Sequence, residues 1–88
     1  DNALKRFDKS TRNTIERVYM MVRKNVRLFV EEPDDYEEYQ LDQAVLHAAI
    51  CIITNRHVNL LERYVEPVIC EIAKKIVYSV NTLNGFVA

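Results

Sequence analysis

The sequence predicts an all-α fold, an antiparallel bundle of three long helices with room for a short fourth helix at the N-terminus or at the break before Pro67. Apolar residues recur at spacings of three and four along most of the chain, which is the periodicity of a helix face. The chain contains one glycine and two prolines, too few turn residues for a sheet-rich fold. These two observations together indicate a helical bundle.

A chain of 88 residues, 49% of them hydrophobic and 28% charged, has the size and composition of one globular domain. We therefore expect residues 1–88 to form a single helical domain, in which residues 1–9 are a lead-in helix or a tail that folds back. Because the first residue is Asp1 and not methionine, we expect the chain to be a fragment of a longer protein.

The first helix is expected over residues 9–31, with Asp8 or Ser10 capping its free amides. Its apolar face is formed by residues three and four apart: Ile15, Val18, Val22, Val26 and Phe29.

Pro33 interrupts this helix, because proline removes an amide donor and disfavours helix in the residue before it. The second helix is expected over residues 35–54. Asp34 or Asp35 should cap it, with a glutamate three residues later as in a capping box.

Residues 44–53 are the most apolar stretch of the chain and are polar only at His47. Such a stretch must be covered on nearly every side, so it is expected at the centre of the core. A buried strand over residues 49–54 is the alternative, but three alanines and the lack of a partner strand favour a helix.

The third helix is expected to start near Asn59, with Glu62 three residues on, and to end at Asn84-Gly85, with Phe86 packed on its last turn. Pro67 must either kink this helix or begin a new one after a short turn.

Charge is sorted by segment. Residues 1–30 carry eight Lys or Arg and three acids, residues 31–42 carry seven acids and no Lys or Arg, and the rest is nearly neutral. The basic face of the first helix consists of Arg12, Arg17, Arg23, Lys24 and Arg27. This face has three interpretations: a solvated surface partly neutralised by the acidic segment, a site for an acidic protein, or a site for nucleic acid. It lacks the interleaved aromatic residues that stack bases.

Nothing in the sequence predicts an enzyme, a cofactor or a metal site. His47 and Cys51 lie four residues apart, which is a spacing of helical metal ligands, but a core cysteine beside a histidine is the simpler interpretation. Cys51 and Cys70 are expected to be free thiols, with a bridge between them as the alternative. No run is long enough to span a membrane, and an intracellular location, in cytoplasm or nucleus, is expected.

The second and third helices have more apolar surface than a three-helix bundle needs to bury. We therefore expect a non-catalytic protein–protein interaction or oligomerisation module, a homodimer or a hetero-complex. A nucleic-acid-associated domain that uses the basic face is the alternative. The expected interface residues are Tyr36, Tyr39, His47, Ile50, Ile53, Val65, Ile69 and Val77.

Overall fold

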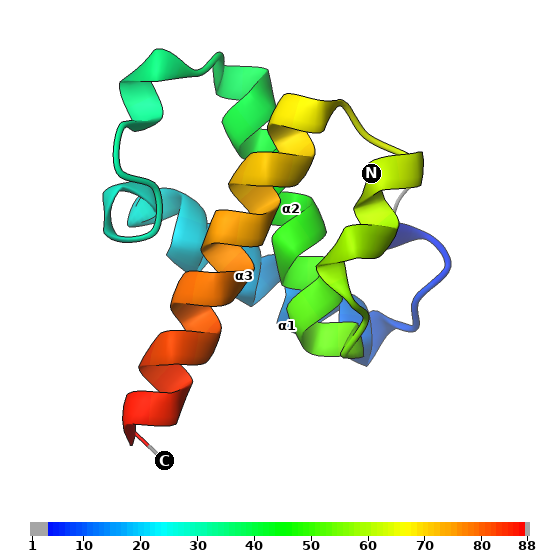
Figure 1. Cartoon of the computed structure of the whole chain (residues 1–88). Coiled ribbons are helices and arrows are strands. Elements are labelled where there is room, and N and C mark those ends of the chain that lie inside the picture. The colour runs from blue at the N-terminus through cyan, green and yellow to red at the C-terminus, as the bar shows by residue number, and fades with distance from the viewer. Residues whose placement is uncertain (1–3, 88) are drawn as a thin grey trace.

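The structure, a computed structural model, describes residues 4–87 and the side chains of residues 4–82. Helices are the only regular elements in that range, and the predicted all-α bundle is confirmed (Figure 1). Three helices are long: α1 Lys9–Lys24, α2 Glu38–Thr54 and α3 Pro67–Val87. Three short 3₁₀ helices connect them: η2 Val26–Leu28, η3 Pro33–Asp35 and η4 Val58–Arg63.

The central helix of the bundle is α2, which packs against both α1 and α3. The Tyr39 hydroxyl in the first turn of α2 lies 3.3 Å from both carboxylate oxygens of Glu66, the residue before α3. The long helix α3 therefore begins beside the start of α2. Both helices run from the top of the view toward the bottom, and they cross (Figure 1). The antiparallel course predicted for the second and third long helices is corrected here, because η4 carries the chain back before α3 starts.

The start of α1 is as predicted and its end is earlier. The Asp8 carboxylate accepts a hydrogen bond of 2.8 Å from the Thr11 amide, which caps the helix. At the other end the Asn25 side chain donates to the Met21 carbonyl at 2.8 Å. An asparagine side chain that competes for backbone groups in this way ends the α-helix at Lys24, and residues 26–28 continue as η2.

The cap of α2 differs from the prediction. Asp34 and Asp35 lie in η3, and Glu37 takes the cap position, with its amide donating to the Gln40 side chain at 3.0 Å. At the far end Asn55 adopts a left-handed conformation, with φ of 56°, and closes the helix after Thr54.

Pro67 is the first residue of α3, where its missing amide costs nothing. The short fourth helix predicted at this break is η4, which is capped by His57 and not by Asn59. The helix α3 continues to Val87, past the end expected at Asn84-Gly85. The packing expected of Phe86 lies outside the described side chains.

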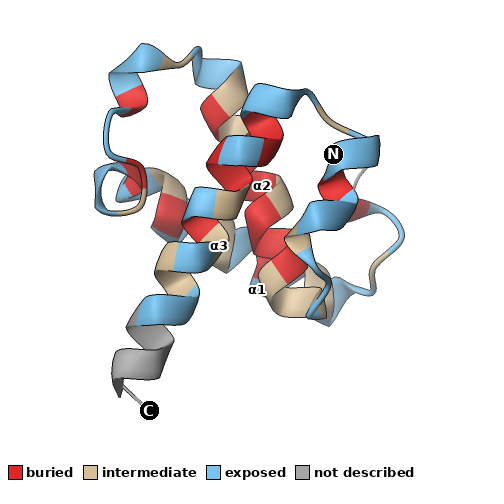
Figure 2. Cartoon of the chain, viewed as in Figure 1, coloured by how far each residue is buried: buried red, intermediate tan, exposed pale blue. Residues whose placement is uncertain are grey.

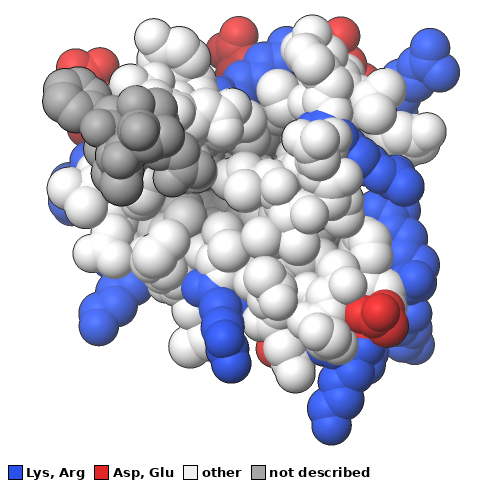
Figure 3. Space-filling model, turned by 90° about the horizontal axis from the view of Figure 1, so that it is seen from below, with Lys and Arg blue, Asp and Glu red and all other residues white. Residues whose placement is uncertain are grey.

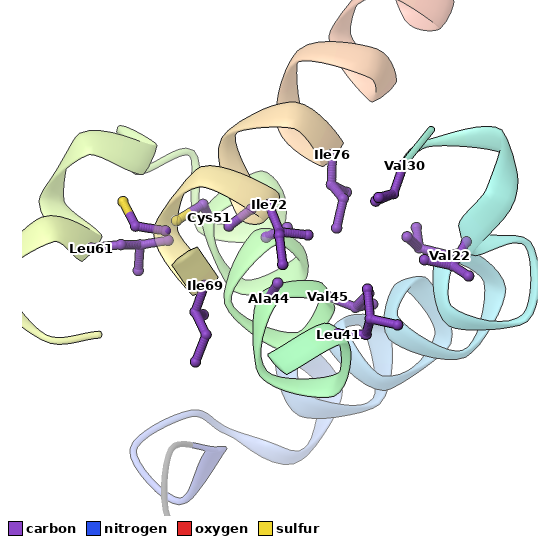
Figure 4. Packing of buried hydrophobic residues seen from close by; sticks show 14 residues of the cluster. Val22, Val30, Leu41, Ala44, Val45, Cys51, Leu61, Ile69, Ile72 and Ile76 are labelled. Carbon is purple, nitrogen blue, oxygen red and sulfur yellow. The ribbon is translucent and has the colours of Figure 1, made fainter. Parts of the chain in front are cut away.

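The core consists of two adjoining clusters, and α2 contributes to both. Figure 2 shows that buried positions make up much of α2. In the larger one, Ile72 and Ile76 of α3 meet Val45 of α2 and Val22 of α1 (Figure 4). The smaller cluster consists of Leu4, Ile15, Leu46, Ala49 and Ile50.

Cys51 and Cys70 are buried free thiols, as predicted. Within residues 4–87, no helix combines the length and the apolar character that crossing a membrane requires.

Candidate functional site

A pocket of about 350 Å³ opens between the N-terminal segment, the second half of α2 and η4. We call it the arginine pocket. Its lining residues are Arg6, His47, Ile50, Cys51, Arg56, His57, Leu60, Leu61, Arg63 and Tyr64. Its volume lies in the range of ligand pockets in proteins, roughly 300–1,000 Å³.

One wall of the arginine pocket is a face of α2. His47, Ile50 and Cys51 are at positions i, i+3 and i+4, which lie on one side of an α-helix. Ile50 and Cys51 are buried and form an apolar floor, whereas His47 is half-buried. The helix thus presents one imidazole above an apolar base.

The opposite wall is an edge of η4. Residues three apart align along a 3₁₀ helix, and His57, Leu60 and Arg63 have this spacing. The Asn59 amide donates to His57 Nδ1 at 3.2 Å, so Nε2 carries the proton of the neutral ring in this arrangement. A 3₁₀ turn therefore places a histidine, a leucine and an arginine side by side.

The N-terminal segment supplies the third side of the pocket. Leu4 is 6% exposed and is part of the smaller core cluster, and the Phe7 amide donates to the Leu4 carbonyl at 3.2 Å. The Arg6 guanidinium lies 4.9 Å from the centre of the Phe7 ring, a cation–π distance. Residues 4–7 thus pack on the bundle through Leu4, and they carry Arg6 to the pocket.

The arginine pocket is strongly cationic. No Asp or Glu lines it, and none of its three arginines forms an ion pair with a described side chain. Glu62, the acid of η4, instead pairs with Lys74 of α3 at 2.7 Å. Lys and Arg side chains gather on the right of Figure 3, the side where η4 and the N-terminal segment lie in Figure 1.

Two titratable groups in the pocket respond to this environment. Burial, and secondarily the charge of Arg6, lower the pKa of His47 below 6.5, so the imidazole is neutral at pH 7. Burial raises the pKa of the Cys51 thiol, an effect that nearby Arg56 partly opposes. A raised pKa keeps the thiol protonated, and a protonated thiol is a poor nucleophile.

The structure places the predicted interface residues in four settings. Ile50 and Ile69 are 4% and 5% exposed and belong to the core, and Ile50 also lines the arginine pocket. His47 lines the arginine pocket. The partly buried residues that pack on the core are Tyr36, Ile53, Val65 and Val77. The side chain of Tyr39 is 53% exposed, and its hydroxyl faces Glu66.

The basic face predicted on the first helix is partly neutralised by acids of residues 31–42. Arg23 pairs with Glu38 and, at 2.6 Å, with Asp42. Arg27, which lies in η2, pairs with Asp34 at 2.9 Å. The remaining members of the face, Arg12, Arg17 and Lys24, form no ion pair with a described side chain.

The sequence reasoning identified His47 but missed the arginines of the pocket. Arg56 and Arg63 lie in a stretch expected to be a turn and the start of an α-helix, in which the three-residue spacing of η4 carries no signal. Within the described residues, no group of three His, Cys, Asp or Glu side chains could hold a metal ion.

Comparison of the chain with protein-family models, with curated proteins and with solved structures gave no match.

Proposed function

We propose that this chain is a non-catalytic protein-interaction module that docks an acidic segment of a partner protein in the arginine pocket. One observation carries the proposal: three arginines, two histidines and no carboxylate surround an apolar floor. Guanidinium groups bind carboxylates through paired hydrogen bonds in a fixed fork. A partner that supplies carboxylates would complete the charge balance of the pocket.

The rim of the pocket also favours a protein partner. Leu60 and Tyr64 are 51% and 78% exposed, so large apolar side chains face solvent beside the arginines. Tyrosine and arginine are enriched in protein interfaces and among the residues that contribute most of the binding energy. The best-matched segment therefore carries an apolar residue among its acids.

Nucleic acid is disfavoured as the ligand by two of the ion pairs. Arg23 and Arg27, members of the basic face, are already paired with carboxylates. The acids of residues 31–38 beside them would repel the phosphates of a nucleic acid, because like charges close together weaken binding.

The test is a binding titration with a fluorescein-labelled peptide of alternating glutamate and leucine, followed by anisotropy at low salt. The variant is Arg56→Gln/Arg63→Gln, which removes two exposed guanidiniums from the pocket. Hydrogen bonds to charged groups contribute about 1.5–3 kcal/mol in full. For these exposed arginines we take about 1 kcal/mol each after solvent screening, so affinity should fall about 30-fold.

The matched control is Arg17→Gln/Lys24→Gln, which removes the same charge from exposed positions of α1. This control should bind the peptide nearly as well as the unmodified chain. Equal losses in the two variants would show that binding follows net charge only, and a loss confined to the control would place the site on the basic face. Either result would refute the proposal.

A further inference from the structure

The chain carries an anionic surface that is complementary to the arginine pocket. We call residues 31–38 the acidic segment. Its acids are all exposed: Glu31, Glu32, Asp34, Asp35, Glu37 and Glu38. Pro33 is buried and Tyr36 packs against the larger core cluster, so the segment is anchored with its carboxylates toward solvent.

Some of these carboxylates form ion pairs within the chain, and others form none with a described side chain. Asp34 pairs with Arg27 and Glu38 with Arg23, whereas Glu31 and Glu32 form no ion pair with a described side chain. A hydrogen bond and repulsion from Asp35 raise the pKa of Glu32. Crowded carboxylates of this kind would be stabilised by an outside cation.

The two complementary surfaces lie on opposite sides of one molecule. In Figure 1 the acidic segment is at the left, between α1 and α2, and η4 and the N-terminal segment are at the right. The molecule measures 34 × 32 × 23 Å and α2 lies between the two surfaces. One chain cannot bring its own acidic segment to its own arginine pocket, but two chains can.

We infer that the arginine pocket of one copy binds the acidic segment of a second copy, so that the chain associates head to tail. This inference rests on the proposed function and names the partner. Aromatic contact adds to the charge pairing, because Tyr39 stands exposed at the end of the acidic segment and Leu60 and Tyr64 stand exposed at the pocket. The contact joins two different surfaces, so each added copy leaves one of each surface open and assembly continues.

The test uses light scattering with size-exclusion chromatography on the 88-residue chain and two neutralised variants. Arg56→Gln/Arg63→Gln removes charge from the pocket, and Glu31→Gln/Glu32→Gln removes charge from the acidic segment. At low salt the unmodified chain should exceed the mass of two chains as its concentration rises, and 0.5 M salt should return it toward one chain. Each variant alone should stay close to the 10.3 kDa of a single chain.

The equal mixture of the two variants is the decisive sample. The acidic segment of the pocket variant can bind the intact pocket of the other variant, and no further site then remains, so the mixture should stop at two chains. Arg17→Gln/Lys24→Gln should assemble like the unmodified chain. Circular dichroism of every variant verifies that its helices are retained.

Three results would overturn the inference: a monomeric unmodified chain at low salt, assembly that both variants retain, or a mixture that behaves as the sum of its components. The glutamate–leucine peptide separates this failure from failure of the proposed function. If the peptide binds the pocket of a chain that stays monomeric, the partner is another protein and the proposed function stands. If the peptide also fails to bind, both proposals are refuted.

Discussion

Leu4 holds the N-terminal segment against the bundle, and replacing it with alanine should open the arginine pocket on one side. Its side chain is 6% exposed and packs in the smaller core cluster with Ile15 and Leu46. Arg6 follows two residues later and is itself exposed. The position of Arg6 in the pocket therefore depends on Leu4.

The expected magnitude follows from the burial of this leucine. Full burial of a leucine side chain contributes about 1.5–3 kcal/mol, and truncation to alanine in a core costs about 2–5 kcal/mol. We take about 2 kcal/mol, at the low end, because a terminal segment can move to fill the space. A change of that size shifts the equilibrium between the docked and detached N-terminal segment about 30-fold toward the detached form.

Nuclear magnetic resonance can measure both consequences in Leu4→Ala. Burial and the charge of Arg6 lower the pKa of His47, so detachment should raise this pKa toward 6.5. The Phe7 amide, which donates to the Leu4 carbonyl, should exchange with solvent about 30-fold faster, in proportion to the open population.

Leu60→Ala is the control, since it removes an exposed leucine from the other wall of the pocket. Phe7 exchange should be unchanged in this variant. An unchanged His47 pKa and an unchanged Phe7 exchange rate in Leu4→Ala would contradict this reasoning. Leu4 would then not hold the N-terminal segment as the third side of the pocket.

Three further predictions concern the fold that supports the pocket. Ile72 is fully buried, so Ile72→Ala should lower the free energy of unfolding by about 3 kcal/mol and the melting temperature by about 12–24 °C, while the exposed Lys75→Ala should change little by calorimetry. Arg23→Met removes two ion pairs that are partly exposed to solvent, and it should lower the free energy of unfolding in urea by about 1 kcal/mol. This loss should exceed that of Arg17→Met and should shrink in 1 M salt. Equal losses in Arg23→Met and Arg17→Met would contradict the pairing. Because the pKa of folded His47 is below its unfolded value of 6.5, the unfolded state binds more protons and stability should fall as pH drops below about 6.5; His47→Gln should lose this slope, and an unchanged slope in urea titrations would refute the cause.

The sequence predicted those elements whose boundaries are set by local chemistry. The Asp8 cap fixes the start of α1, and the left-handed Asn55 closes α2 at the expected Thr54. Pro67 allowed either a kink or a new helix start, and the structure has the new start. Periodicity also identified much of the core, including Ile15, Val22 and Val26 of the first predicted helix and the stretch around His47.

Sequence patterns did not predict the 3₁₀ geometry of the short helices. Leu61 and Val65 are four residues apart and favour an α-helix, but a pattern over so few residues is ambiguous, and tertiary packing makes residues 58–63 the 3₁₀ helix η4. The same ambiguity hid the arginine pocket. His57 and Arg63 come together only at the three-residue period of η4, and Arg6 reaches them only because Leu4 is buried.

The most direct test of the proposed binding site is an amide chemical-shift map of the isotope-labelled chain during titration with the glutamate–leucine peptide. We predict shift changes over residues 4–7, 47–51 and 56–64, which line the arginine pocket or flank its lining, and none at Arg17 on the exposed side of α1. Shift changes centred on residues 12–24, or no change at saturating peptide, would contradict the assignment of the pocket as the docking site.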